Sequence, residues 1–288
     1  MTAHPNHKSF KSAHVTQHFF VLSAREAAGK NIAAQLDDIS LQYLQQCRAM
    51  GIAPESISRK FLVSDIANQA SDILSHPTFQ DSESHPAAIA IVQQQPLEFG
   101  ARVTLIAHHI TGASHLQRKK VAPGHVLIDG TQTPMLLADL HVEKPVSTYD
   151  DTRQLFDAHI RALNEQGGTL KDNGVRTWIF VDGIDKRYPD MVRGRNEAFA
   201  REGITGNPRY MASTGIGGQG RTGNVQMGFL SLPGLKPEQV IVLNAPDWLN
   251  APRDYHPTPL PFERGLKVSY RDCNHLYLSE PVLKGVEW

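Results

Sequence analysis

The most unusual stretch of the sequence is a glycine-rich segment over residues 211–223, which reads MASTGIGGQGRTG. Five glycines accompany Ser213, Thr214 and Arg221 there. Because glycine has no side chain, clusters of this kind let backbone N–H groups come close to an anionic ligand. The spacing fits neither a phosphate-binding loop nor a dinucleotide fingerprint, and we expect no cofactor. The segment predicts either a ligand-binding cleft or a plain mobile loop.

Arginine and amide side chains stand close to this segment in the predicted elements. Arg176 lies on a predicted strand over residues 175–182, and Arg195 and Asn196 lie on a predicted helix over 188–202. A planar guanidinium group can bind a carboxylate through two parallel hydrogen bonds. A helix cap or a salt bridge is the alternative role, and no catalytic residue is assigned. The substrate-binding candidates are Arg176, Arg195, Asn196, Tyr210, Ser213, Thr214 and Gln226.

Histidine and cysteine do not combine into a recognisable metal site. His108 and His109 are adjacent on a predicted strand, so their side chains should point to opposite faces of the sheet. The two cysteines, Cys47 and Cys273, are far apart, which argues against a disulfide framework or a cysteine zinc site. We therefore expect no bound metal.

Length and charge restrict the class of protein. A chain of 288 residues suggests about two domains. Lys+Arg and Asp+Glu both number 29, so no overall charge favours nucleic acid, and the basic residues 118–120 predict a solvated linker. No apolar run approaches the ~20 residues that span a bilayer, and residues 1–12 lack an apolar leader. We expect a cytoplasmic protein without nucleic-acid or membrane partners.

Periodicity predicts the same order of elements in both halves of the chain. Each half has opening strands, a long helix, a strand, a shorter helix and closing strands. Gly51 should end the first long helix, and Asp150 or Asp151 should cap the helix of the second half. The predicted strands cover residues 15–23, 57–65, 87–93, 101–110, 126–130, 135–142, 175–182 and 224–232; the predicted helices cover 31–50, 66–74, 149–165 and 188–202.

The repeated order indicates duplicated domains. Residues 58–65 align with 175–182 at a shift of 117, and the opening HFFVLS of 18–23 returns in 125–130 and again in 274–279. A segment with five prolines separates the second copy from the third echo and predicts an extended linker. The predicted organisation is a first domain over 1–113, a second over 114–242, a linker over 243–262, and the start of an incomplete third copy over 263–288.

Two sets of motifs resemble known families. Residues 86–92 (PAAIAIV) followed by 100–107 (GARVTLIA) resemble the closing signature of the RidA/YjgF (L-PSP) superfamily. Residues 175–178 (VRTW), 194–199 (GRNEAF) and 212–217 (ASTGIG) resemble the first domain of chorismatases, which are double RidA-like proteins. The resemblance implies an α+β fold of tandem RidA-like (chorismate-mutase-like) β-α-β-α-β units, each an antiparallel-rich sheet backed by two helices. It also implies a homo-oligomer, a trimer or pseudo-trimer, with sites in clefts between adjacent domains.

The sequence departs from both families at positions that carry chemistry. Where RidA deaminases hold a carboxylate-binding arginine, the two copies read Ala-Ala-Ile at 87–89 and Met-Ala-Ser at 211–213. The carboxylate of the last strand is also absent, with Thr104 and Gln226 nearby. After Leu278-Ser279 the chain continues Glu-Pro, where a chorismatase second domain continues Gly-Thr-Ala-Ser.

Three functional hypotheses follow. The first is a protein that binds a small organic acid between domains, with hydrolase or deaminase activity on an imine or enamine. The second is a chorismatase-like enzyme that processes chorismate. The third is a non-catalytic binding or regulatory protein, which the missing arginine favours.

Overall fold

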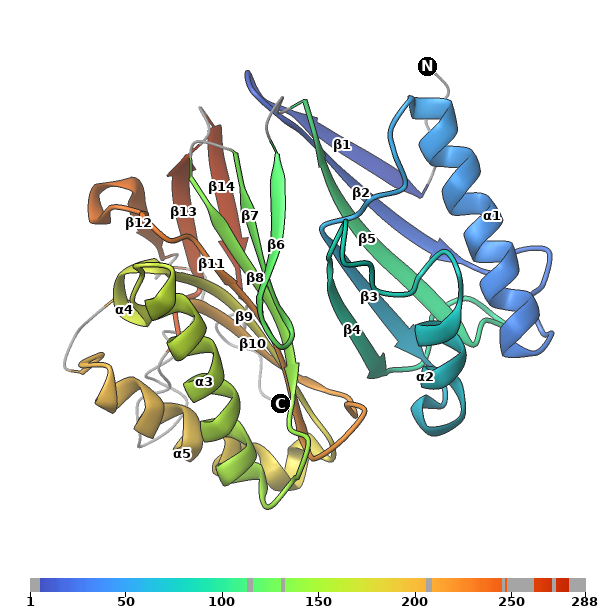
Figure 1. Cartoon of the computed structure of the whole chain (residues 1–288). Coiled ribbons are helices and arrows are strands. Elements are labelled where there is room, and N and C mark those ends of the chain that lie inside the picture. The colour runs from blue at the N-terminus through green and yellow to red at the C-terminus, as the bar shows by residue number, and fades with distance from the viewer. Residues whose placement is uncertain are drawn as a thin grey trace.

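The computed structural model describes residues 6–112, 116–130, 133–205, 209–244, 247, 262–270 and 273–279, and its strands form three sheets (Figure 1). The first has the order β1-β2-β5-β3-β4, the second β10-β9-β11-β8-β7-β6, and the third β12-β13-β14. Apart from β6, the second sheet has the strand order of the first. Each of these two sheets also ends in one parallel pair, β3/β4 or β9/β10.

The elements have these bounds. In the first sheet and its helices they are β1 His7–Lys11, β2 Thr16–Ser23, α1 Ile32–Met50, β3 Ser58–Val63, α2 Ile66–Ser75, β4 Ala88–Gln93 and β5 Val103–Thr111. In the second they are β6 Gln117–Ala122, β7 His125–Asp129, β8 Met135–His141, α3 Thr148–Glu165, α4 Leu170–Asn173, β9 Gly174–Val181, α5 Ile184–Arg201, β10 Ala212–Gly217 and β11 Val225–Ser231. The last are the 3-10 turn η1 Pro237–Gln239, β12 Val240–Leu243, β13 Gly265–Tyr270 and β14 Cys273–Leu278.

Helices cover only the outer face of each large sheet. In Figure 1, α1 and α2 lie on one side of the molecule and α3 and α5 on the other, with the sheets between them. The inner faces of the two sheets are turned toward each other. Backbone hydrogen bonds join their edges, because the N–H groups of Gln93 and Gln219 each donate to the other residue's carbonyl, at 2.8 and 3.3 Å.

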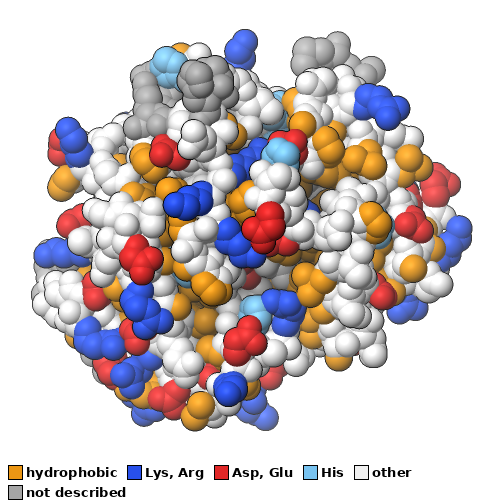
Figure 2. All heavy atoms as spheres, in the orientation of Figure 1, with side chains coloured by type: hydrophobic (Ala, Val, Ile, Leu, Met, Phe, Trp, Pro, Cys, Tyr) orange, Lys and Arg blue, Asp and Glu red, His pale blue; other side chains and the backbone are white. Residues whose placement is uncertain are grey.

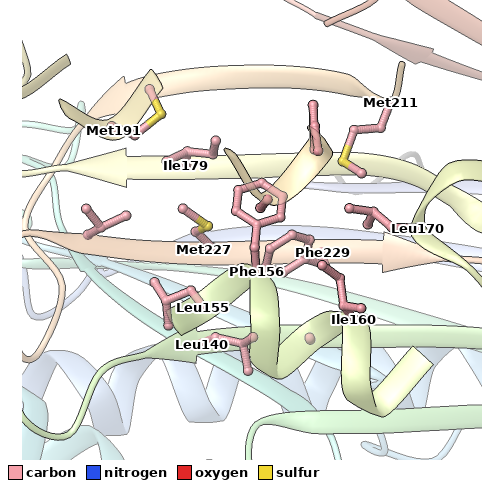
Figure 3. Packing of buried hydrophobic residues seen from close by; sticks show 14 of the residues in the cluster. Leu140, Leu155, Phe156, Ile160, Leu170, Ile179, Met191, Met211, Met227 and Phe229 are labelled. Carbon is pink, nitrogen blue, oxygen red and sulfur yellow. The ribbon is translucent and has the colours of Figure 1, made fainter. Parts of the chain in front are cut away.

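The core behind the second sheet is built from aromatic and sulfur-containing side chains (Figure 3). The ring of Phe156 on α3 meets those of Phe199 and Phe229 edge to face, at centroid distances of 5.5 and 5.3 Å. Met191 and Met227 fill the space beside these rings. Edge-to-face packing places the positive rim of one ring against the negative face of the next, so the three rings fix how α3 and α5 lie on the sheet.

Several predicted elements are confirmed. The helix ending at Met50 is followed by Gly51 in the left-handed region, φ 66°, as the C-terminal glycine predicted. His108 and His109 do point to opposite faces. His109 is buried against Tyr43, with 2.7 Å between its Nε2 and the tyrosine hydroxyl, whereas His108 faces the other large sheet.

The basic linker predicted at residues 118–120 is wrong, because these residues lie in β6, at the edge of the second sheet. Arg118 Nη1 donates to the Ser56 carbonyl at 3.3 Å, and Lys120 Nζ pairs with Asp81 Oδ2 at 2.9 Å. Charged side chains are typical of edge strands, where they discourage pairing with another chain. Three adjacent charged residues lack the alternation of apolar and polar residues that predicts a strand, so the sequence did not indicate β6.

Other local predictions need correction. Ser147, not Asp150 or Asp151, caps α3, and its hydroxyl accepts from the Asp150 backbone N–H. The glycine-rich segment is not a loop throughout, since its first half forms β10. The polar residues near the N-terminus also hold a strand, β1. Most of the proline-rich stretch over 243–262 lies outside the described residues.

The shift of 117 between the two halves is wrong by one residue. Val63 and Val181 each pair with the first residue of a closing strand, Val103 and Val225 respectively, so the structural shift is 118. A one-residue slip in a strand moves every side chain to the opposite face. For this reason Arg59 points toward the helices of its sheet and Arg176 does not, although the sequence motif aligns them.

No helix in the described part of the chain is both long enough and apolar enough to cross a membrane.

Replacing Phe156 by alanine should lower the free energy of unfolding by roughly 3–5 kcal/mol, because it leaves a cavity among three packed rings. The matched control is Phe99→Ala. Phe99 is 101% exposed, so its removal should change stability by less than ~0.5 kcal/mol. Chemical denaturation of both variants measures the difference, and equal losses would contradict this account of the core.

Candidate functional site

The space between the inner faces of the two large sheets is a cavity of about 590 Å³. Side chains from β3, β4 and β5 line one wall, those from β8, β9 and β11 line the other, and the hairpin β13–β14 closes part of it. Cavities that hold small metabolites typically have volumes of 300–1,000 Å³. The cavity therefore has the size of a metabolite site.

Alternation along the strands decides which side chains reach the cavity. On β9 the residues at 179 and 181 join the core under the helices, so Trp178 faces inward. On β8 and β3 the same rule turns Asp139 and Lys60 inward, while Leu140 and Phe61 pack under the helices. One acid and one base thus enter a mostly apolar space from opposite walls.

Lys60 comes from the first sheet but lies against aromatic rings of the second. Its Nζ is 5.0 Å from the ring centroid of Trp178 and 4.9 Å from that of Phe180. Burial lowers the pKa of Lys60, while the nearby charge of Asp139 acts in the opposite direction. No salt bridge holds Lys60 within the part of the chain that the structure describes. Lys60 is among the residues that line the cavity.

Asp139 is the buried acid of the second wall. Its Oδ1 accepts a hydrogen bond from Gln226 Nε2 at 2.5 Å. Burial raises the pKa of Asp139 to about 7, against the opposing effects of Lys60 and the Gln226 hydrogen bond. A carboxyl group with a pKa near neutrality can both donate and accept a proton under ordinary conditions.

Polar groups also line the first wall. The His108 ring stacks on Phe19 with 4.4 Å between centroids, and its Nε2 lies 3.0 Å from Gln17 Oε1. All three residues line the cavity. They place hydrogen-bonding groups opposite the apolar surface of Trp178, so a ligand would meet both a flat ring and polar atoms.

The seven residues predicted as substrate-binding do not form one cluster. Arg176, Thr214 and Gln226 lie on the inner face of the second sheet, and Arg195 and Ser213 lie on the opposite face, under α5. Gln226 does not line the cavity itself, but it donates a hydrogen bond to Asp139, which does. Strand alternation explains the separation. Ser213 and Thr214 are neighbours on one strand, so their side chains point to opposite faces of the sheet.

Arg176 is a buried arginine beside the cavity. Its Nη2 donates to Thr214 Oγ1 at 2.5 Å, and its guanidinium lies 5.0 Å from the Trp178 ring centroid. Burial lowers the pKa of Arg176 to about 10, and its Nη1 has no partner in the described part of the chain. Arg176 orients the Trp178 ring and does not itself line the cavity.

Two other candidates connect the second sheet to the third. The backbone N–H of Tyr210 donates to Glu263 Oε1 at 3.1 Å, and that of Ser213 donates to Ser279 Oγ at 2.9 Å. Asn196 lies half-buried on α5, with its Oδ1 unpartnered among the described residues. These groups hold the third sheet or lie outside the cavity.

Lys60, Asp139 and Trp178 line the cavity, and sequence reasoning did not select them. A signal exists, because Asp139 interrupts the apolar run MLLADL and Lys60 interrupts a strand. The sequence did not show that residues 79 positions apart would face one cavity. Among the described residues no group of three histidine, cysteine or acidic side chains could hold a metal ion.

Comparison with solved structures identifies the fold. A chorismatase aligns with a TM-score of 0.55 and 19% identity, covering 78% of this chain and 63% of that one. The fold is that of the chorismatases. The chain therefore spans a little under two thirds of that protein's length. A YjgF-family protein from Neisseria meningitidis aligns over 38% of the chain (TM-score 0.30, 13% identity, 98% of that chain), and yeast Mmf1 over 42% (0.26, 21%, 89%).

No protein-family model and no curated protein sequence matches the chain. The predicted α+β class, with antiparallel-rich sheets backed by helices, is confirmed by the chorismatase-like fold. At 19% identity this likeness carries the fold alone.

The raised pKa of Asp139 predicts a specific dependence of stability on pH. Between its ordinary value of 3.8 and about 7, the folded state binds more protons at this carboxyl than the unfolded state does. Stability from this group is therefore full at low pH and falls as pH rises to 7, by up to roughly 4 kcal/mol. Asp139→Asn should remove that loss.

The measurement is the difference in unfolding free energy between wild type and Asp139→Asn at pH 5 and pH 8. Taking the difference cancels the buried histidines, such as His109, whose lowered pKa makes stability fall toward acid. Asp81→Asn, at a surface salt bridge, is the control and should show no such trend. A wild-type advantage at pH 8 would refute the assignment.

Proposed function

We propose that the chain binds a small carboxylate-bearing metabolite in the cavity between the two large sheets and acts on it as a hydrolase or deaminase. The observation that carries the proposal is the presence of Lys60 and Asp139 on opposite walls of one apolar cavity. Strongly perturbed ionisable groups in a cleft are typical of functional sites. The ligand would be an organic acid with a flat unsaturated part.

Lys60 supplies the attraction for the carboxylate. In an apolar cavity an ammonium group interacts with an anion far more strongly than it does in water. Trp178 offers a flat surface on which a conjugated double bond can stack. Because a lysine makes one point contact, it holds the carboxylate with less directional control than the paired contacts of an arginine. Lys60 would thus take over the role of the carboxylate-binding arginine of RidA deaminases, which this chain lacks at the corresponding positions.

Asp139 supplies the proton. An imine takes up a proton at its nitrogen and an enamine at its β-carbon, and water then adds to the resulting iminium ion. The anionic Asp139 accepts a proton from that water and returns it to the amino group, so that the C–N bond breaks and ammonia leaves. The pKa of Asp139, about 7, suits both steps at neutral pH. Gln226 binds Oδ1, so Oδ2 is the oxygen that this hydrogen bond leaves for proton transfer.

A chorismatase-like reaction is the second candidate, favoured by the chorismatase fold. An enol ether, like an enamine, needs a proton on an electron-rich double bond before water can add. The same Lys60 and Asp139 roles therefore serve both reactions, and the substrate distinguishes them. A non-catalytic binding protein would use Lys60 without Asp139.

The test supplies purified protein with 2-iminobutyrate, generated in place, and separately with chorismate. Asp139→Asn should lower kcat by roughly 10²–10³-fold, because it removes a general acid and base. Lys60→Met should raise KM by roughly 10–100-fold, because it removes a charged contact. Ammonia release measures the first reaction and chorismate absorbance the second.

Lys120→Met and Asp81→Asn are the matched controls, since they change the same residue types in a pair on the surface. Both should leave turnover unchanged. A third outcome is saturable binding of an organic acid, weakened by Lys60→Met, without turnover of either compound. This outcome would support the hypothesis of a non-catalytic binding protein. Binding or turnover that is insensitive to Lys60 and Asp139 would overturn the proposal.

A further inference from the structure

Arg195 on α5 is a buried cation with an unusual lack of partners. Its side chain lies between α5 and the second sheet, and the residue is 2% exposed. The Nε and Nη2 atoms are buried and have no hydrogen-bond partner among the described residues. Other arginines are better satisfied: the buried Arg59 donates through Nη1 to two backbone carbonyls, and the half-buried Arg209 donates to three.

Packing on either side fixes where Arg195 lies above the sheet. One or two turns earlier, the side chains of Tyr188 and Met191 lie over Gly215 of β10. One turn later, Phe199 stacks on Tyr210, with 5.9 Å between ring centroids. Arg195 occupies the same face of α5 between these contacts. It therefore lies above the middle of residues 210–215, which is Ser213.

Two hydroxyl groups share this location. Ser213 on β10 and Thr177 on β9 are paired across the parallel strands, and both turn toward the helices. The hydroxyl oxygens Ser213 Oγ and Thr177 Oγ1 are buried and, like Arg195, have no partner within the described ranges. Helix spacing and strand register thus place a guanidinium edge and two hydroxyls, all capable of donating, in the same part of the layer between α5 and the sheet.

Nothing in the described part of the chain neutralises the charge. The groups whose charges act on Arg195 are Tyr188 and Tyr210, and neither is a carboxylate. Burial lowers the pKa of Arg195 to about 10, which leaves the side chain positively charged at neutral pH. Buried charges in proteins are normally paired, because an isolated one loses its hydration without compensation.

We propose that Arg195, Ser213 and Thr177 form a binding site for one small inorganic anion of the size of chloride. An anion accepts hydrogen bonds from all of these donors and neutralises the guanidinium, whereas a water molecule would leave the charge uncompensated. Met191 and Phe199 on the same face of α5 are buried in the core, which favours a small ligand over a large one. The site lies on the opposite face of the sheet from the cavity.

The direct experiment is crystallisation of the full chain in sodium bromide, with anomalous diffraction at the bromine edge. An anomalous peak between Arg195 and the Ser213 hydroxyl is expected. A structure in which a water molecule alone occupies this place, or in which the guanidinium turns to a protein carbonyl, would overturn the proposal.

A solution experiment tests the same site without a crystal. Chloride is varied against gluconate at constant ionic strength, and Tm is recorded. For wild type we expect Tm to rise by roughly 5 °C as chloride reaches about 100 times its dissociation constant. Arg195→Met should abolish this rise, because methionine has a similar length and no charge. Arg209→Met, which removes a well-partnered arginine, should retain it.

The double variant Ser213→Ala, Thr177→Val keeps the arginine. Its chloride dependence of Tm provides a second test if Arg195→Met does not fold. The double substitution should raise the chloride concentration needed for the same effect by roughly 10–100-fold, because two hydrogen bonds to the anion are lost. A wild-type Tm that does not respond to chloride, or an equal response in all variants, would contradict an anion site at Arg195.

Discussion

The packing of the two large sheets, inner face to inner face, is the contact on which the other features depend. Each sheet has helices on its outer face only, so its inner face has to be covered by the other sheet or by the third. Backbone hydrogen bonds between Gln93 and Gln219 join the sheets at one edge. Away from that edge a space of about 590 Å³ remains between them.

Burial of Lys60 and Asp139 in this space works against stability. Apolar side chains of similar volume would avoid the loss of hydration, and replacing buried ion pairs in this way is often neutral or stabilising in proteins. The same burial brings the pKa of Asp139 to about 7 and lowers the pKa of Lys60. The two residues are therefore better explained by chemistry in the cavity than by support of the fold.

On the face seen in Figure 2, basic and acidic side chains are interspersed, without a large patch of one sign.

Much of the fold could be predicted from the sequence, because it depends on local patterns. Helical periodicity placed α1 and α2 within a residue or two, and Gly51 marked the end of α1. The side of the sheet to which an individual side chain points was harder to predict. A shift of 117 in place of 118 put Arg59 and Arg176 in equivalent positions, although they point to opposite sides of their sheets.

The seven binding residues predicted from the sequence are divided between two faces of the second sheet for a related reason. The arginine, amide and glycine residues near 195–220 are close in the chain, but strand alternation sends Ser213 and Thr214 to different faces. Lys60 and Asp139 are distant in the chain, and only the stacking of two sheets brings them to one cavity. Proximity in sequence therefore indicated that these residues belong to the second sheet, but not on which face of the sheet each side chain lies.

The most direct measurement is a ¹³C NMR titration of the side-chain carboxyl groups, with the Asp139 signal assigned by its loss in Asp139→Asn. We expect this carboxyl to titrate near pH 7 and its signal to shift when an organic acid enters the cavity, while the signal of Asp81 should not shift on addition of the organic acid. A titration midpoint near 4 without response to any organic acid would contradict the central claim.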